Sequence, residues 1–275
     1  MRIELLTMKK IHSVQLEMMK ELIVVMNKLD VKYYFVHGSL LGAVVIEDFI
    51  PEDDDIDIAI MREDYNRLLE QGNKYLPEHY FLQSSQNDDF PLSFAKMRDS
   101  RTSFIQPVLD NCKCNKGIYI DIFPIDYSAK NKAEKVIEKL MSIRINRRLV
   151  TFERLSYKGS LVRAFSLLFF PSYSKTICDR EIMYSRREVS ENVSLTNGKV
   201  SEQNIPLKWF DKGVKKKFCG IDVTCPSMYH DYLKKVYSEN YISVNPAKER
   251  LTGSKLIEIS AEVLDFEQSY KEYED

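Results

Sequence analysis

The sequence predicts an α+β protein, and three observations support this fold class. Near the start of the chain, apolar residues recur at steps of three and four, the period of an amphipathic helix. Two later segments alternate polar and apolar residues, as strands with one buried face do. Beyond about residue 126, long charged segments of helical composition follow. We therefore expect a sheet-bearing core over residues 1–128 and a mostly helical extension over 129–275, packed together as one domain.

The chain opens with its most regular helical pattern. Apolar side chains from Ile11 to Leu29 fall on one face, and the pattern ends near Asp30. The aromatic and β-branched run "KYYFVHGS" follows, which predicts a short strand that enters a turn at Gly38. A second, short helix is expected to begin near Ser39, because its hydroxyl suits an N-cap.

Two segments have the two-residue period of a strand. In "DIDIAIM" the alternation puts Asp55 and Asp57 on one face. In "GIYIDIFPID" it puts Asp121 between Tyr119 and Phe123. The isoleucines of both segments take the opposite face (Ile56, Ile58, Ile60, Ile118, Ile120 and Ile122). Each predicted strand therefore separates acidic from apolar side chains.

The remaining segments complete a mixed pattern of helices and strands. The segment "REDYNRLLEQGNKYL" predicts a helix, and "YFLQSS", "SFAKMRD" and "TSFIQP" predict further short strands. In the second half we expect helices over roughly 130–150, 155–170 and 174–191. A strand pair and then a helix after Pro226 are predicted near the C-terminus.

The composition of the chain limits the kinds of molecule and metal that we expect the protein to bind. The 40 basic and 41 acidic residues give a formal net charge of -1, so we expect no nucleic-acid partner bound through bulk positive charge. The five cysteines form an odd and scattered set, which favours reduced thiols in a cytoplasmic protein. A structural zinc site at the C-x-C pair Cys112 and Cys114 is the alternative for those two residues.

No signal peptide is apparent, because charged residues interrupt every stretch of the first segment. The longest apolar run, residues 161–171, is about half as long as the roughly 20 apolar residues that span a membrane. We interpret it as a buried helix, with peripheral contact to a membrane surface as the alternative. The expected location is the cytoplasm, with the inner face of the membrane as a candidate place of action.

The acidic run before residue 58 poses a physical problem, because crowded carboxylates repel one another and burying one without a partner is unfavourable. A divalent cation resolves it. Asp55 and Asp57 can hold a hard, oxygen-seeking ion from one side, and Asp121 on a second strand can complete the set. We expect Mg²⁺, with Mn²⁺ as the alternative, and two ions for the three carboxylates. Gly38 and Ser39, at the start of a predicted helix, form a candidate cradle for substrate phosphates.

Two other interpretations of the acidic run remain open. Asp53, Asp55 and Asp57 match the first ligand positions of a calcium loop, with Asp64 at its last position. However, Ile58 stands where that loop needs glycine. The run could instead be a solvated loop without function, but the isoleucine alternation disfavours this for its last two aspartates.

At these residues the sequence resembles the LicD family, the phosphocholine transferases that decorate bacterial surface glycans, whose relatives include the fukutin-type phospho-sugar-alcohol transferases. The matching pieces are "YYFVHGSLLGAV", "FIPEDDDIDIAIMREDY", "FAKMRDSRTSFI" and "GIYIDIFPID", with a weaker match in "KKKFCGIDVTCPSMYHDYLKKVYSENY". They follow in order over most of the chain. The resemblance implies a nucleotidyltransferase-like fold, with a mixed β-sheet core and flanking helices.

The resemblance also implies an activity. Family members transfer phosphocholine or a related phospho-alcohol from CDP-choline or another CDP-alcohol, with magnesium. The acceptor is a hydroxyl of a glycan, a lipid-linked oligosaccharide, lipopolysaccharide or a teichoic acid precursor. The resemblance implies that Asp55 and Asp57 bind the metal and that Asp121 completes the site, nearest the attacking hydroxyl. It places Gly38 and Ser39 near the donor phosphates. The alternatives are a nucleotidyltransferase and a non-catalytic calcium-binding or scaffold protein.

The sequence departs from the family pattern beside the acidic run. Family members commonly have "RHKGFIPWDDDID", whereas this chain has "VVIEDFIPEDDDID". Glu47 thus stands where lysine is usual and Asp48 where glycine is usual, and Glu52 replaces an aromatic residue. Lys96 and Arg98 in "AKMRD" are candidates to supply the missing positive charge to the donor; the alternative is two exposed charges. Aromatic rings available for a choline ammonium group are those of Tyr33, Tyr34, Tyr119, Phe123 and Trp209.

Overall fold

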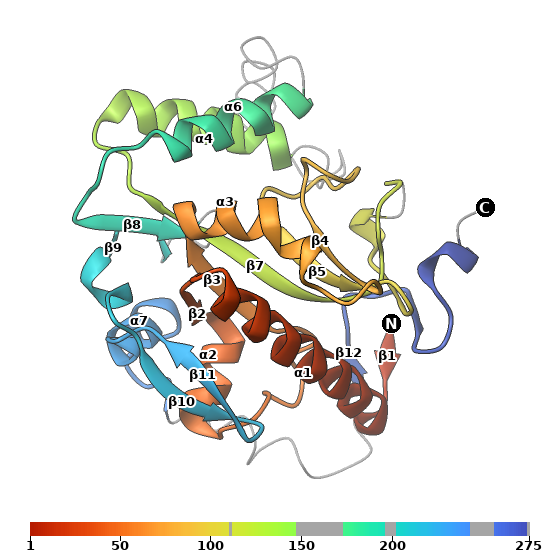
Figure 1. Ribbon diagram of the computed structural model, residues 1–275. Coiled ribbons are helices and arrows are strands. Elements are labelled where there is room, and N and C mark those ends of the chain that lie inside the picture. Colours follow the sequence, from red (N-terminus) through yellow and green to blue (C-terminus); the bar gives the residue numbers. More distant parts are fainter. Residues whose placement is uncertain (110–111, 147–172, 196–201, 243–255, 274–275) are drawn as a thin grey trace, which may run out of the picture.

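The computed structural model describes residues 1–109, 112–146, 173–195, 202–242 and 256–273. Helices and strands alternate along this part of the chain, which confirms the predicted mixture of the two (Figure 1).

A seven-stranded mixed sheet forms the centre of the fold. Its longest strand is β7 (Ile118–Tyr127). On one side of β7 lies β3 (Asp57–Met61), the parallel neighbour, and β2 (Tyr33–Phe35) pairs antiparallel with β3 at the edge. The parallel register puts Asp57 opposite Asp121.

The other side of β7 pairs with two strands in succession. Its first half pairs antiparallel with β5 (Ala95–Asp99), which pairs in turn with β4 (Tyr80–Gln83). The end of β7 pairs antiparallel with β8 (Asn192–Leu195), and β9 (Ile205–Pro206) pairs with β8. Residues from the second half of the chain therefore extend the central sheet.

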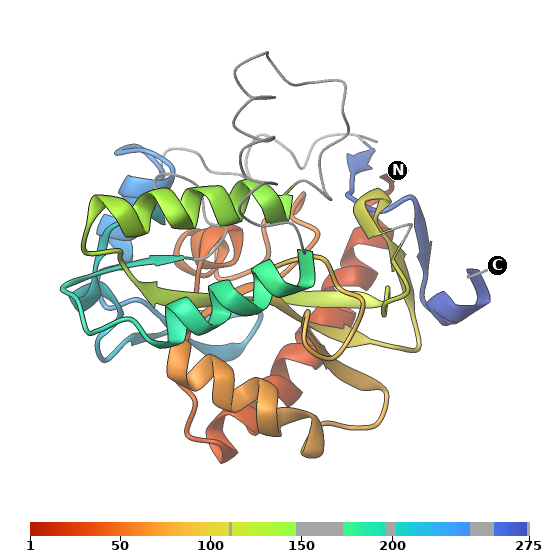
Figure 2. The ribbon, with the colours of Figure 1, turned by 90° about the horizontal axis from the view of Figure 1, so that it is seen from above.

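Helices cover the sheet on both faces. The long helix α1 (Leu5–Lys28) and α3 (Arg62–Gln71) lie on one face, and α2 (His37–Val45) lies on the other (Figure 2). The helices α4 (Lys132–Asn146) and α6 (Tyr173–Ser185) pack together across one end of the sheet. Four 3₁₀ segments complete the described connections: η1 (Gly72–Lys74), η2 (Pro107–Leu109), η5 (Leu207–Phe210) and η6 (Tyr270–Tyr273).

The amphipathic pattern of the first segment explains how α1 packs. Its buried side chains include Met8, Ile11, Met18 and Leu22, which recur at helical spacing and are 0% exposed. Their burial against the sheet supplies the apolar contact that a helix needs for stability. The predicted first helix is confirmed and begins six residues earlier than the pattern suggested, at Leu5.

Later parts of the chain pack back on the first half. The strands β10 (Val214–Phe218) and β11 (Ile221–Cys225) form an antiparallel hairpin beside β2 and α2. The helix α7 (Tyr229–Val236) follows and contacts α2. The predicted strand pair and the helix after Pro226 are therefore confirmed.

The C-terminal segment returns to the start of the chain. Strand β12 (Ile257–Glu258) pairs with β1 (Arg2–Ile3), and β13 (Val263–Asp265) pairs with β6 (Ser103–Ile105). The amino group of Met1 donates a hydrogen bond to the carbonyl oxygen of Ala261 at 2.7 Å. Residues more than 250 positions apart in the sequence thus lie side by side (Figure 1).

Two expectations about secondary structure need correction. Ser39 is not an N-cap, because α2 begins at His37 and its capping position, Val36, makes no side-chain capping bond. The second half is helical only in part: α4 and α6 confirm two predicted helices, but the described residues after Ser185 are mainly short strands and connecting segments. The predicted helix over 155–170 lies outside the described residues.

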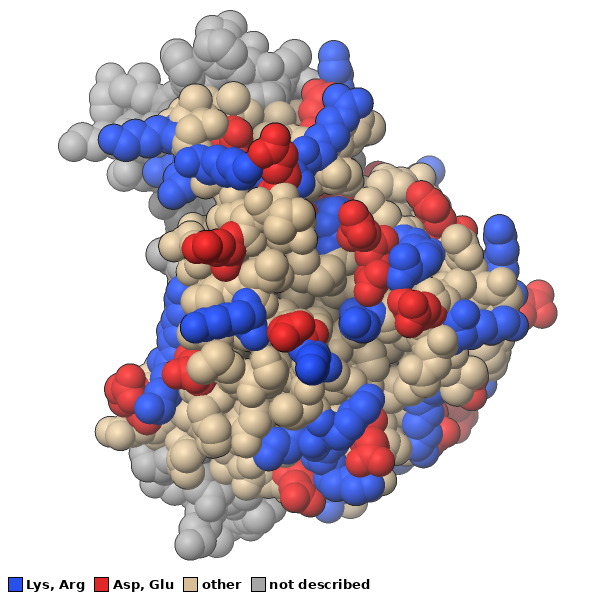
Figure 3. All heavy atoms as spheres, turned by 60° about the vertical axis from the view of Figure 1, so that its left-hand side comes forward, with Lys and Arg blue, Asp and Glu red and all other residues tan. Residues whose placement is uncertain are grey.

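Charges of both signs are interspersed on the face shown in Figure 3, which fits the balanced composition.

Among the described helices, none has the length and apolar character needed to cross a bilayer.

A buried ionic cluster joins α3, β7 and α6. The guanidinium of Arg62 donates two hydrogen bonds to the carboxylate of Asp126, at 2.7 and 2.8 Å, and it also pairs with Glu181. Arg62 and Asp126 are 5% and 1% exposed, so solvent screens these charges little. The cluster ties the helical layer to the end of the longest strand.

We predict that Arg62→Ala destabilises the protein by about 3 to 5 kcal/mol, because it leaves the buried carboxylate of Asp126 and the half-buried carboxylate of Glu181 without this cation. Urea unfolding measures the effect. Lys20→Ala is the control, since the pair of Lys20 with Glu17 on α1 is exposed and should contribute about 0 to 1 kcal/mol. Equal stability of the Arg62 variant and the control would contradict the role of this cluster.

Candidate functional site

Three aspartates converge where β3 and β7 run side by side. Asp57 begins β3, Asp121 lies in the first half of β7, and Asp55 is two residues before Asp57. One carboxylate oxygen from each lies within 4.8 Å of the other two. These three residues, the acidic triad, have the geometry to hold a metal ion, as the sequence predicted.

The parallel register and the alternation of side chains explain this convergence. Asp57 and Asp121 are direct neighbours across the two strands, and the backbone N–H of Asp121 donates to the carbonyl oxygen of Ile56 at 2.8 Å. The isoleucines of both strands point away from the triad into the core, where all are 0% exposed (Ile56, Ile58, Ile60, Ile118, Ile120 and Ile122).

The triad is electrostatically strained. Burial and the charges of Asp57, Asp53 and Asp121 raise the pKa of Asp55 well above its usual range. Burial also raises the pKa of Asp121 to about 6, although the ammonium of Lys96 opposes this shift. Both shifts mean that the folded protein disfavours the ionised carboxylates. A set of acidic oxygen donors that repel one another fits a hard divalent cation such as Mg²⁺ or Mn²⁺.

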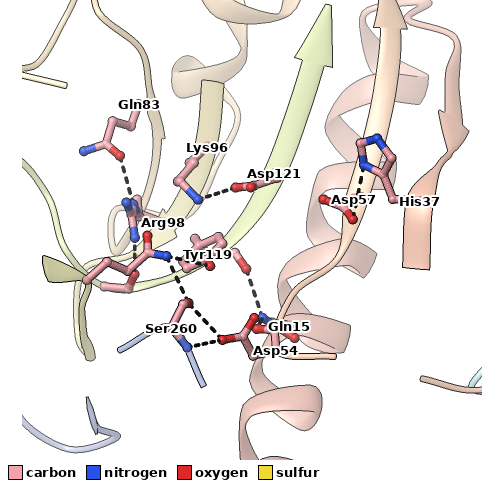
Figure 4. A network of polar contacts seen from close by, with 12 residues as sticks. Gln15, His37, Asp54, Asp57, Gln83, Lys96, Arg98, Tyr119, Asp121 and Ser260 are labelled. Carbon is pink, nitrogen blue, oxygen red and sulfur yellow. Dashed lines mark hydrogen bonds and ion pairs between the residues drawn. The ribbon is translucent and has the colours of Figure 1, made fainter. Parts of the chain in front are cut away.

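Lys96 lies at the triad. Its ammonium on β5 donates to Oδ1 of Asp121 at 2.5 Å and sits 3.3 Å from the centre of the Tyr119 ring (Figure 4). Lys96 is 2% exposed, and burial lowers its pKa. The alternative of two exposed charges is therefore wrong for this residue.

Arg98 is also buried, but its partners differ. Its guanidinium donates to Oε1 of Gln83 at 2.9 Å and to the carbonyl oxygen of Gly117 at 2.8 Å. It lies over the ring of Tyr119, on which Lys96 also rests. Arg98 thus supports the side chains beside the triad, and contact of Arg98 with a donor stays a prediction.

Gly38 and Ser39 both lie against residues of the acidic run in the structure. A Cβ atom at Gly38 would lie 1.8 Å from Oδ2 of Asp53, so the glycine leaves room for that carboxyl group. The hydroxyl of Ser39 accepts a hydrogen bond from the backbone N–H of Asp57 at 2.8 Å. Both residues therefore help to position the triad, and their proximity to donor phosphates stays a prediction.

The residues before the triad are held by distant parts of the chain. The carboxylate of Asp54 accepts hydrogen bonds from the backbone N–H and the hydroxyl of Ser260, at 2.8 and 2.9 Å. Gln15 on α1 donates from its amide to the carbonyl oxygens of Asp54 and Tyr119 (Figure 4). Burial and the nearby charge of Asp57 raise the pKa of Asp53 to about 7. Asp53 and Asp54 are thus half-buried, and the solvated-loop interpretation stays an alternative for these two residues.

His37 is a site residue that the sequence analysis missed. Its Nδ1 lies 3.4 Å from Oδ2 of Asp57, and its Nε2 pairs with Glu202. Burial lowers the pKa of His37, but the two carboxylates outweigh burial and raise the pKa to about 10. Because 165 residues separate the histidine from Glu202, no local pattern could have linked them.

The calcium-loop interpretation does not fit the structure. Asp64 lies on α3, where its carboxylate pairs with Arg67 and accepts the backbone N–H of Lys32 at 2.9 Å. It does not join the acidic triad. Cys112 and Cys114 form no disulfide and lie in a small apolar cluster. The one candidate metal cluster of the described residues contains neither.

The segment that departs from the family pattern turns toward the β10–β11 hairpin. Asp48 accepts a hydrogen bond from the thiol of Cys219 at 2.8 Å, and the carbonyl oxygen of Glu47 accepts the backbone N–H of Cys219. These acidic residues therefore have a structural partner in the turn of the hairpin.

Few of the aromatic candidates for choline lie at the triad. Tyr34 is 2% exposed and donates from its hydroxyl to the carbonyl oxygen of Asp211 at 2.9 Å, and Tyr33 is also buried. Phe123 lies 5.0 Å from His37, measured between ring centres, so it borders the triad. Tyr119 is already in contact with the ammonium of Lys96.

Comparison with known proteins agrees with this geometry. Residues 30–151 match the family model described as LicD/FKTN/FKRP, nucleotidyltransferase domain. The chain is also 23% identical over 234 residues to "Lipopolysaccharide cholinephosphotransferase LicD" of Haemophilus influenzae, covering 80% of this chain and 85% of that protein. These matches support a place for this chain in the LicD family. Shorter matches join it to uncharacterised proteins of Rickettsia typhi (46% identity over 58 residues, 20% of this chain and 19% of that protein) and Rickettsia prowazekii (46% over 48 residues, 18% of each).

The LicD match contains the whole acidic triad and Lys96, but not all of their supports. Glu202, which pairs with His37, and Ser260, which binds Asp54, both lie beyond residue 151. Residues beyond this match therefore complete the surroundings of the site.

We predict that Asp55→Asn raises the melting temperature of the metal-free protein, because a neutral amide removes one of the crowded charges. Mg²⁺ or Mn²⁺ should raise the melting temperature of the wild-type protein by mass action, and this increase should be lost in the variant. Thermal shift with and without metal measures both effects.

Asp54→Asn is the matched control, since Asp54 is adjacent but bonds to Ser260. It should keep the stabilisation by metal. An Asp55 variant that metal stabilises as strongly as the wild type would show that the triad is not the binding site.

Proposed function

We propose that this protein transfers phosphocholine, or a related phospho-alcohol, from a CDP-activated donor to a hydroxyl of a cell-surface glycan or teichoic acid precursor, in a metal-dependent reaction. The protein is a phosphotransferase of the LicD family. The name of its Haemophilus influenzae relative supports choline phosphate as the transferred group and lipopolysaccharide as the kind of acceptor. The donor, the metal and the teichoic acid alternative are the parts that this proposal adds.

The convergence of Asp55, Asp57 and Asp121 carries the proposal. All three donors are carboxylate oxygens, which is the ligand type that Mg²⁺ and Mn²⁺ prefer. When bound there, such an ion supplies positive charge to the pyrophosphate oxygens and to the leaving CMP. The three aspartates would hold this ion, and together they would hold at most two such ions.

The side chains around the triad have separable tasks. The acceptor oxygen forms a bond to the phosphorus that carries the alcohol, and the bond from that phosphorus to CMP breaks. Asp121 accepts the proton of the acceptor hydroxyl, and CMP leaves with the bonding electron pair. Lys96, at 2.5 Å from Asp121, is the buried cation nearest to these charges and is placed to contact a donor phosphate.

The proposed acceptor also bears on where the enzyme acts. A lipid-linked oligosaccharide would be met at a membrane surface, and we propose that the enzyme acts there from the cytoplasm. The absence of disulfides among the described cysteines agrees with a reducing compartment.

A second candidate function is nucleotidyl transfer, favoured by the description of the matched family model as a nucleotidyltransferase domain. In that reaction the nucleotide itself joins the hydroxyl, and pyrophosphate leaves. The same carboxylates and cation would serve it. The two reactions differ in the product released.

We predict that the protein with Mg²⁺ releases CMP from CDP-choline in the presence of simple sugar alcohols and hexoses, and releases no pyrophosphate from CTP. Asp57→Asn and Asp121→Asn should lower CMP release by at least about 100-fold, because each removes a ligand from the triad. Chromatography of the nucleotide products measures both reactions.

Asp54→Asn should retain CMP release. This variant removes a negative charge beside the triad but none of its three carboxylates, so it controls for the loss of charge. Pyrophosphate release from CTP without CMP release from CDP-alcohols would establish the second candidate. Normal rates in the Asp57 variant would contradict both.

A further inference from the structure

A buried chain of polar contacts joins α7 to the acidic triad. The hydroxyl of Tyr232 on α7 donates to Oε1 of Glu202 at 2.8 Å, and Nε2 of His37 pairs with the same oxygen. The other ring nitrogen, Nδ1, lies 3.4 Å from Oδ2 of Asp57. Tyr232 and Glu202 are 0% exposed, so water does not compete for these contacts.

The backbone at His37 shows that its position depends on these partners. Its φ is 48°, in the left-handed region that residues other than glycine seldom adopt. The ring also meets the ring of Phe123 edge-on, with 5.0 Å between centres and an angle of 83°. Unfavourable backbone conformations persist where the surroundings hold them, and they gather at functional sites.

Packing alone does not explain a carboxylate at residue 202. Removing an ionised carboxylate from water is strongly unfavourable unless its partners compensate. An apolar side chain could fill the same space beside Tyr232 without that penalty. The acceptor oxygen of Glu202 is better explained by its contact with the histidine ring.

We infer that Glu202 is a positioning residue of the metal site. It acts through His37, whose two ring nitrogens face the carboxylates of Glu202 and Asp57. The ring thus directs the carboxylate of Asp57 toward the rest of the triad. Metal-binding side chains are commonly oriented by such hydrogen-bonded neighbours. The inference rests on the proposed function only in taking the triad as a metal site.

The test is calorimetric titration with Mn²⁺ in the absence of any donor. Glu202→Ala should weaken Mn²⁺ binding by about 10- to 100-fold, the usual effect of removing a partner of a metal ligand. Glu202→Gln retains an oxygen that accepts from His37 and should restore the affinity to within about threefold of the wild type. A role in packing alone would change the melting temperature without this pattern of rescue.

Glu138→Ala is the matched control. Glu138 on α4 also accepts a hydrogen bond from a tyrosine hydroxyl, that of Tyr184 at 2.8 Å, but it makes no contact with the triad. Its Mn²⁺ affinity should equal that of the wild type. Where Glu202→Ala does not fold, His37→Phe tests the same link, because phenylalanine keeps the ring against Phe123 and removes both nitrogens.

His37→Phe should weaken Mn²⁺ binding as Glu202→Ala does, and combining these two substitutions should cause no further loss, since the two residues act in series. A folded Glu202→Ala or His37→Phe protein with wild-type Mn²⁺ affinity would overturn the inference. A wild-type protein that binds no Mn²⁺ would overturn it together with the metal site. Mn²⁺ binding with normal rescue but no CMP release from CDP-choline would contradict the proposed function alone.

Discussion

The parallel pairing of β3 with β7 forces three carboxylates together. In this register Asp57 stands opposite Asp121, so the pairing that completes the sheet also concentrates negative charge inside it, with oxygens within 4.8 Å of one another. Removal from water and mutual repulsion both oppose this arrangement. The surroundings of the triad consist of groups that offset that opposition: the ammonium of Lys96, the ring of His37 and, when present, a divalent ion.

The residues that surround the triad come from widely separated parts of the sequence. Gln15 belongs to the first helix, and Lys96 belongs to a strand on the far side of β7. Glu202 lies in the segment before β9, and Ser260 lies in the C-terminal segment that returns to the start of the chain. No local segment contains both the charges and their supports. The site therefore depends on the global fold, and the core around α1 and the central sheet acts as its scaffold.

The sequence predicted those parts of the fold that repeat a period. The helix α1 and the strands β3 and β7 follow from regular spacing, and the acidic face of both strands predicted that the triad would meet. The burial of Lys96 could not be foreseen, because polar alternation on a strand looks the same whether that face meets water or a charged interior. The hydroxyl of Ser39 was assigned to a helix cap since the sequence does not reveal that the N–H of Asp57 needs an acceptor. Strand β8, with four residues, is too short to show a period, so the second half seemed more helical than it is.

The return of residues 257–261 to the N-terminus has a consequence for biosynthesis. A ribosome releases the acidic run long before Ser260, and the strand that pairs with β1 emerges in the same late stretch. A nascent chain can contain every triad aspartate and still lack the bond that anchors Asp54. Catalytic competence should therefore arise late in translation, and a premature stop codon before residue 257 would leave a protein that has its ligands without their tether.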